Sequence, residues 1–155
     1  MKTLSLTQPW ATLVAIGAKQ IETRSWNTSY RGPLAIHAAK GLGPVGGKRG
    51  LSETCGTEPF CSVLNEYGRS QRWKDLADMV TRPLLPQGTI IAIVELYDIR
   101  ATTTISDAIS QQELAFGDYS IGRYAWLLRN AEMLPEPTPA RGALGLWEWT
   151  KGGAR

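Results

Sequence analysis

The sequence has few of the residues from which metal sites and redox sites are built. Its 155 residues include two cysteines and a single histidine, His37. A structural zinc site needs about four Cys, His or acidic ligands at recurring spacings, so we expect no metal and no cofactor. Cys55 and Cys61 lie close together in a stretch rich in Gly, Thr and Pro, a spacing compatible with a local disulfide.

Long apolar runs are also absent. No run approaches the ~20 apolar residues of a membrane-spanning helix. The apolar start is interrupted at Gln8 and Pro9, too early for a signal peptide. We therefore expect a soluble, cytoplasmic protein without a membrane partner. The one low-complexity tract is the tail 151–155, which we expect to be flexible.

Neither catalytic signatures nor charge identify a function. The sequence has no phosphate-binding glycine loop, no nucleophile-elbow serine and no HExxH motif, so any catalysis must rest on Lys, Glu and hydroxyl groups. Lys and Arg number 17 against 14 Asp and Glu, a net charge of +3. That mild excess is compatible with a polyanionic partner but does not establish one.

The length and composition are those of one globular domain. At 155 residues, of which 43% are hydrophobic, the chain can bury a core without disulfides or metals. We expect a single domain over residues 1–150, with a monomer as the default state.

Apolar periodicity predicts mostly strands, with a few short helices. Strands are expected over residues 3–6, 20–26, 34–38, 89–99, 124–134 and 144–149. The 89–99 strand is apolar on both faces and should be central. A helix should begin at residues 7–9, with Thr7 as its cap, and end at Gly17. Further helices are expected over 62–80 and, capped by Ser106 and Asp107, up to about Leu114.

Glycine and proline mark the irregular parts of the chain. Residues 40–86 should form a helical and loop insertion over the sheet, in which 40–59 is a loop because it holds six glycines and two prolines. Residues 135–139, with three prolines, should also be a loop. Many strands, few helices and no βαβ repeat favour an α+β fold built on a mixed β-barrel.

The segment 17–26 is the first candidate functional region. It places Lys19 at a turn and Glu22, Arg24 and Trp26 on one face of a predicted strand. Charged and aromatic groups on a common face could hold a phosphate and a base. The ordinary alternative is a solvated outer face with an ion pair within the strand.

Glu95 is the second candidate because it is the one charged residue of the apolar 89–97 stretch. A carboxylate in such a strand should meet a cation, and Lys19 and Arg24 are the natural partners. The pair would be either purely structural or a functional acid and base.

Several further residues are weaker candidates for ligand contacts. His37 lies in an apolar strand, where a hydrogen-bonded core group is more common than a ligand or base. Lys40 could contact phosphate or be a solvated loop lysine. Most of the six tryptophans must be core. Trp26 is the best candidate to stack on a base, with Tyr124 and Trp126 as a second pair.

Five segments together resemble the ASCH domain family: residues 4–10, 17–24 (G-x-K-x-x-E-x-R), 31–38, 88–96 and 124–128. They span nearly the whole chain apart from the insertion. The resemblance implies a barrel related to the PUA RNA-binding fold and an association with RNA or DNA binding. It also implies a cleft beside the barrel, lined by the lysine motif.

The resemblance implies hydrolytic activities as well. Some small bacterial relatives are amidohydrolases that remove the acetyl group from acetylcytidine with a lysine, a threonine and a glutamate, and another type is a ribonuclease. Lys19 matches that lysine and Glu95 the glutamate, while Glu22 stands where the threonine would be. A glutamate cannot serve as the hydroxyl nucleophile, so this departure weakens the amidase hypothesis.

Three hypotheses therefore stand. The first is binding of nucleic acid, RNA foremost, or of a modified nucleoside, in a cleft lined by Lys, Glu and Arg. The second is a metal-independent hydrolase in which Lys19, Glu22 and Glu95 are catalytic. The third is a non-catalytic module for a protein or a metabolite.

Overall fold

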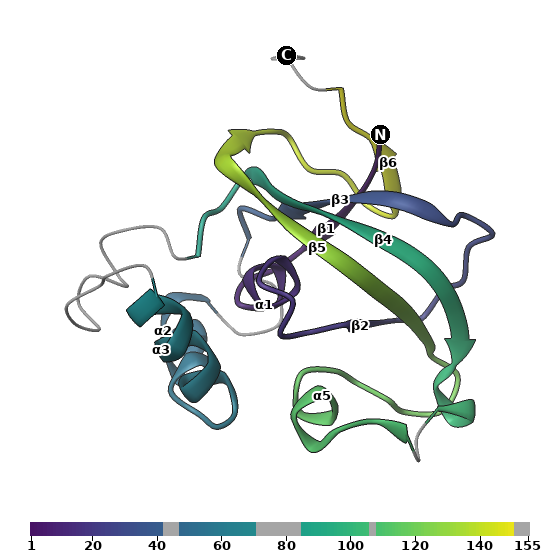
Figure 1. Ribbon diagram of the computed structural model, residues 1–155, viewed down its shortest axis with the longest axis horizontal. Coiled ribbons are helices and arrows are strands. Elements are labelled where there is room, and N and C mark those ends of the chain that lie inside the picture. Colours follow the sequence, from purple (N-terminus) through teal and green to yellow (C-terminus); the bar gives the residue numbers. More distant parts are fainter. Residues whose placement is uncertain (42–46, 71–84, 106–107, 151–155) are drawn as a thin grey trace.

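A six-stranded curled sheet organises the chain, as the computed structural model of residues 1–41, 47–70, 85–105 and 108–150 shows (Figure 1). Its order is β2-β5-β4-β3-β1-β6. The strands are β1 Lys2–Leu6, β2 Ile21–Arg24, β3 Gly32–Ala38, β4 Thr89–Ala101, β5 Tyr124–Pro139 and β6 Leu146–Glu148. β1 and β3 pair in parallel and the other neighbours are antiparallel. The half-barrel with short helices confirms the α+β prediction.

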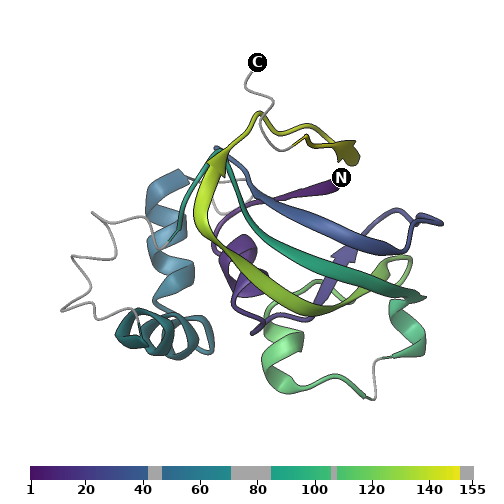
Figure 2. The same cartoon turned by 45° about the horizontal axis from the view of Figure 1, so that its top comes forward.

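Helix α1, Trp10–Ala15, packs inside the curl against β3, β4 and β5 (Figure 2). Its buried residues Ala11, Val14 and Ala15 join the main core. The predicted cap is wrong, because the N-cap residue is Pro9, and the side chain that accepts at the helix start is Gln8, whose Oε1 accepts from the backbone N–H of Thr12 at 3.1 Å. The Gln8 side chain also donates to Pro86 O at 2.8 Å. It therefore connects the start of the helix to the segment just before β4.

The two longest strands, β4 and β5, form the middle of the sheet. β4 is central as predicted, between β5 and β3. β5 runs for 16 residues and includes the segment 135–139, so the prediction of a loop there is wrong. β2 pairs only with residues 124–127 of β5, so the later part of β5 is an open edge. The register with β4 shifts between Met133 and Thr138, so Pro135 and Pro137 have no partner in β4 and their missing N–H groups cost no ladder bond.

Two helices of the 40–86 region pack beside the sheet. α2 spans Gly47–Cys55, so the prediction of a loop over 40–59 is wrong there. α3 spans Phe60–Ser70 and confirms the start of the predicted 62–80 helix, whose remainder lies outside the described residues. Phe60 and Leu64 of α3 form a second apolar cluster with Leu13 and Phe116. Cys55 and Cys61 are free thiols, which answers the open question of a disulfide.

A short helix after β4 approaches β2. A 3-10 turn, Thr102–Thr104, is followed by α5, Gln111–Ala115. The predicted caps, 106–107, lie outside the described residues. The helix starts later than predicted, and Ser110 Oγ caps it by accepting from Glu113 N at 3.1 Å.

The described residues contain no helix long and apolar enough to cross a membrane. In the same part of the chain, no three His, Cys, Asp or Glu residues gather closely enough to hold a metal ion.

Core burial should dominate stability. We expect Leu96→Ala, at a fully buried position, to lower the free energy of unfolding by about 3 kcal/mol. The same substitution at Leu144, which is 98% exposed, should change it by less than about 0.5 kcal/mol. Urea unfolding of both variants tests this. Equal effects would mean that Leu96 is not packed in the core.

Candidate functional site

A buried lysine lies at the start of the candidate site. Gly17 adopts a positive φ of 76° and ends the α1 region, and the next turn brings Lys19 beneath β2. Lys19 is 1% exposed. Its Nζ donates to Ile21 O and lies 3.8 Å from Glu22 Oε2 and 3.7 Å from Glu113 Oε1. Burial lowers the pKa of the Lys19 ammonium, and the two carboxylates act in the opposite direction.

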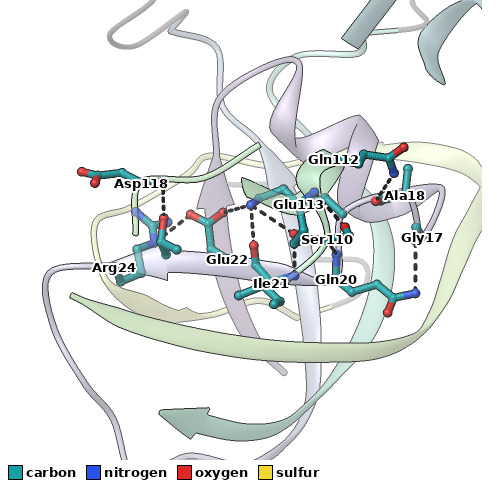
Figure 3. Close-up of polar contacts among 12 residues, drawn as sticks. Gly17, Ala18, Gln20, Ile21, Glu22, Arg24, Ser110, Gln112, Glu113 and Asp118 are labelled. Carbon is teal, nitrogen blue, oxygen red and sulfur yellow. Dashed lines mark hydrogen bonds and ion pairs between the residues drawn. The ribbon is translucent and has the colours of Figure 1, made fainter. Parts of the chain in front are cut away.

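Glu113, which sequence reasoning missed, completes this cluster from α5. Its two carboxylate oxygens accept from the backbone N–H groups of Gln20 and Ile21, each at 3.0 Å (Figure 3). The available signal was the S-x-x-E spacing of Ser110 and Glu113, which is typical of a capping box. That spacing predicts a helix start but not that the carboxylate reaches a strand about ninety residues away in sequence.

Glu22 and Arg24 lie side by side on β2, as predicted (Figure 3). Glu22 Oε1 lies 3.3 Å from Arg24 Nε, so the Glu22 carboxylate is flanked by Lys19 and Arg24. Arg24 Nη2 donates to Ser5 O at 2.9 Å. Arg24 Nε is buried without a hydrogen-bond partner, because the contact with Glu22 has poor hydrogen-bond geometry.

Glu22 and Arg24 line a pocket of about 450 Å³. Half-buried Trp10 supplies aromatic surface, with Phe116, which is 1% exposed, behind the wall, and Asp118 and Arg123 bring further charges of opposite sign. The full lining is Ser5, Leu6, Thr7, Trp10, Glu22, Thr23, Arg24, Ala115, Phe116, Gly117, Asp118 and Arg123. Lys19 lies behind Glu22 and is not part of the lining. We call this space the first pocket.

The wall of the first pocket is tied to β2. Thr23 Oγ1 accepts from Asp118 N at 3.1 Å, and Arg123 Nη2 donates to Thr23 O at 3.1 Å. Tyr119 follows in the same segment, and its buried hydroxyl has no hydrogen-bond partner among the described residues. Burial, then the charges of Glu113 and Glu22, raise the pKa of this phenol.

Glu95 does not belong to this site, so the predicted pairing with Lys19 or Arg24 is wrong. The register of β4 and β5 places Glu95 opposite Arg129. Arg129 Nη2 and Nε donate to the two Glu95 oxygens at 2.7 and 2.9 Å, and Asn130 Nδ2 donates at 3.0 Å. The hydrogen bond from Arg129 lowers the pKa of Glu95. The predicted set of Lys19, Glu22 and Glu95 is therefore not assembled.

The predicted stacking residues lie in or against the core instead of the first pocket. β2 ends at Arg24, so the prediction that Trp26 shares the strand face of Glu22 is wrong. Trp26 packs edge-to-face on fully buried Trp126, with ring centroids 4.7 Å apart, and Trp126 Nε1 donates to Trp26 O. Tyr124 packs against the same core. Trp10 is the tryptophan that lines the pocket, and sequence reasoning treated it only as a helix residue.

His37 and Lys40 line another space, of about 790 Å³, which we call the second pocket. His37 is 2% exposed. Its Nε2 lies 3.2 Å from Ala140 O and its Nδ1 3.0 Å from Ser5 Oγ, as expected of a hydrogen-bonded core histidine. Lys40 is exposed. Ser5 lines both pockets.

The model of the ASCH domain matches residues 4–138. The chain belongs to the ASCH domain family. ASCH domains have a PUA-like fold that is associated with RNA binding. Activating signal cointegrator 1 of Mus musculus is 26% identical over 148 residues, which are 94% of this chain and 22% of that protein. The chain thus spans about a fifth of the length of this relative.

Solved ASCH structures share the fold. The ASCH protein of Zymomonas mobilis and a point variant of it each superpose with a TM-score of 0.51 at 14% identity. The alignments cover 97% of this chain and 87% and 90% of those chains. At this identity the likeness extends to the ASCH fold alone.

Removing one carboxylate partner of the buried Lys19 should destabilise the fold. We expect Glu113→Gln to lower the free energy of unfolding by about 3 kcal/mol, because it leaves Lys19 with less compensation and weakens the bonds to β2. Glu148→Gln, at a carboxylate that is 64% exposed, should lower the free energy of unfolding much less, because solvent screens an exposed ion pair. Adding Lys19→Met to Glu113→Gln should restore part of the loss, and purely additive urea-unfolding energies would contradict the pairing.

Stability should also depend on the protonation of His37. Burial lowers the pKa of His37 from its ordinary value of 6.5. The unfolded chain therefore binds the proton first as pH falls, so the free energy of unfolding should decrease below about pH 6.5 and be level above it. His37→Gln should lose this slope in urea unfolding between about pH 5.5 and 8. An unchanged slope would assign it to other groups.

Proposed function

We propose that this ASCH domain binds a nucleobase of RNA, or of a nucleoside, in the first pocket. The observation that carries the proposal is the Glu22 carboxylate, which lines the pocket beside Arg24 and Trp10 and has Lys19 behind it. A pocket of about 450 Å³ has the size of a small-molecule site and can accept a base with part of its sugar.

The polar groups of the first pocket match one edge of a base. The Glu22 carboxylate only accepts hydrogen bonds and the Arg24 guanidinium only donates them. A base edge that carries an amino group and a carbonyl, as in cytosine or guanine, offers both complements. Because Lys19 and Arg24 already compensate the charge of Glu22, a ligand can cover this carboxylate without leaving it unpaired.

Aromatic surface supplies the second part of the binding energy. Trp10 is the half-buried aromatic residue of the lining, while Phe116 is 1% exposed, so Trp10 is the ring on which a base would stack. Stacking of a base on an aromatic side chain is worth about 1 to 3 kcal/mol. Stacking does not depend on what is attached to the base, so the ligand can be a nucleoside or a nucleotide within a strand.

The hydrolase hypothesis, as acetylcytidine amidohydrolase or ribonuclease, finds less support. Lys19 is 1% exposed and lies outside the lining of the first pocket, and Glu95 is bonded to Arg129 elsewhere on the sheet. A group that does not reach the pocket cannot attack or protonate a ligand in it. Binding without turnover is the function that the geometry favours, with the protein- or metabolite-binding module as the remaining alternative.

Glu22→Gln tests base recognition. Calorimetric titration with cytidine should show about a 10-fold to 100-fold loss of affinity, because a hydrogen bond to a charged group is worth about 1.5 to 3 kcal/mol. Uridine, which lacks the amino group, should bind the wild type more weakly and lose less. Glu148→Gln, outside both pockets, should bind as the wild type does.

Three outcomes would contradict the proposal. Equal affinities of Glu22→Gln and wild type for cytidine would exclude the carboxylate as the base contact. Absence of any binding to nucleosides or RNA at low salt would favour the module hypothesis. Release of acetate from acetylcytidine, lost in Glu22→Gln, would favour the hydrolase. Thermal unfolding of each variant confirms that it is folded.

A further inference from the structure

The second pocket lies next to the first, and Ser5 lines both. Its lining comes from the end of β3, from Gly88 and from the segment between β5 and β6: Ser5, His37, Ala39, Lys40, Gly88, Pro139, Ala140, Arg141, Gly142, Ala143 and Leu144. Ser5 O accepts from Arg24 of the first pocket, and Ser5 Oγ contacts His37 of the second. A ligand that extends beyond one nucleotide can therefore occupy both.

The segment 140–143, which forms one wall of the second pocket, is firmly placed. His37 Nε2 lies 3.2 Å from Ala140 O, and Ser5 Oγ lies 3.1 Å from Ala143 O, where its one hydroxyl proton serves either this carbonyl or His37 Nδ1. Between them Gly142 lies so close to His37 that a Cβ at this position would be 2.4 Å from His37 Cε1. Arg141 thus extends from a backbone that is anchored on both sides.

The charge of the second pocket is of one sign. Among the described residues of its lining, the charged ones are Lys40 and Arg141, and none is Asp or Glu. Both side chains are exposed, and neither forms an ion pair with a described residue. The stem of Lys40 passes over Gly88, where a Cβ would lie 2.7 Å from Lys40 Cε, so the lysine is guided along the pocket wall. The first pocket, in contrast, balances Glu22 and Asp118 against Arg24 and Arg123.

We propose that the second pocket binds the phosphate backbone of the nucleic acid whose base occupies the first pocket. Lys40 and Arg141 are the phosphate contacts, since unpaired cations on an ordered wall are the groups that bind phosphate. The ligand is then a single strand of at least two nucleotides rather than a free nucleoside. A duplex is excluded because the base edge that would pair is held by Glu22 and Arg24. This inference rests on the proposed function of the first pocket.

The double variant Lys40→Ala/Arg141→Ala tests the second pocket. Fluorescence anisotropy with a short single-stranded oligocytidine should show at least a 10-fold loss of affinity at low salt. The slope of log K against log salt should fall by about 1.4, since each phosphate contact on a single strand contributes about 0.7. Cytidine affinity should be unchanged, because a nucleoside has no phosphate.

The matched control is Lys2→Ala/Arg100→Ala. It also removes two exposed cations, but both are paired with carboxylates and lie outside the two pockets. Because it also removes two positive charges, its net charge changes by the same amount as that of Lys40→Ala/Arg141→Ala. We expect it to keep most of the affinity of the wild type for the oligonucleotide.

The outcomes separate this inference from the proposed function. Wild-type oligonucleotide affinity and salt slope in Lys40→Ala/Arg141→Ala would overturn the phosphate site, even if Glu22→Gln still weakens cytidine binding. Equal losses in the test and control variants would also overturn it, because net charge alone would explain them. A loss confined to the test variant, together with unchanged cytidine binding in Glu22→Gln, would support the phosphate site and overturn the base site.

Discussion

The burial of one ammonium group constrains the whole region around the first pocket. A cation that is 1% exposed needs opposite charge beside it, and Lys19 finds it in Glu22 of β2 and Glu113 of α5. Glu113 also binds the backbone at the start of β2, so α5 is held against this strand. Residues 115–118, which follow directly, thereby become a wall of the first pocket.

Local alternation and the end of a helix could be predicted from the sequence, because they depend on neighbouring residues. The turn at Gly17 and the common face of Glu22 and Arg24 follow from the spacing of a few residues. The apolar run of β4 likewise indicated a central strand, and the structure confirms it. The family and its fold were predictable because several such segments occur together in order.

Strand register and distant partners could not be predicted, because they depend on how the whole sheet closes. Glu95 meets Arg129 through the pairing of β4 with β5, which includes several register shifts. Glu113 reaches Lys19 only once α5 is docked against β2. The prolines of β5 indicated a loop because a strand tolerates them only where its N–H groups are unpaired, and that depends on the short β2 and on the register shift against β4. The phosphate-facing character proposed for Arg141 depends on anchors from His37 and Ser5.

The position of Ser5 in both pockets has a consequence for how tightly each must bind. In the proposed binding mode, a nucleotide held in one pocket confines the next nucleotide near the other pocket, so the second contact forms within a single complex. For short flexible connections the effective concentration is in the millimolar range. In that proposal, two individually weak sites that share Ser5 would together retain a strand more firmly than either retains a single nucleotide.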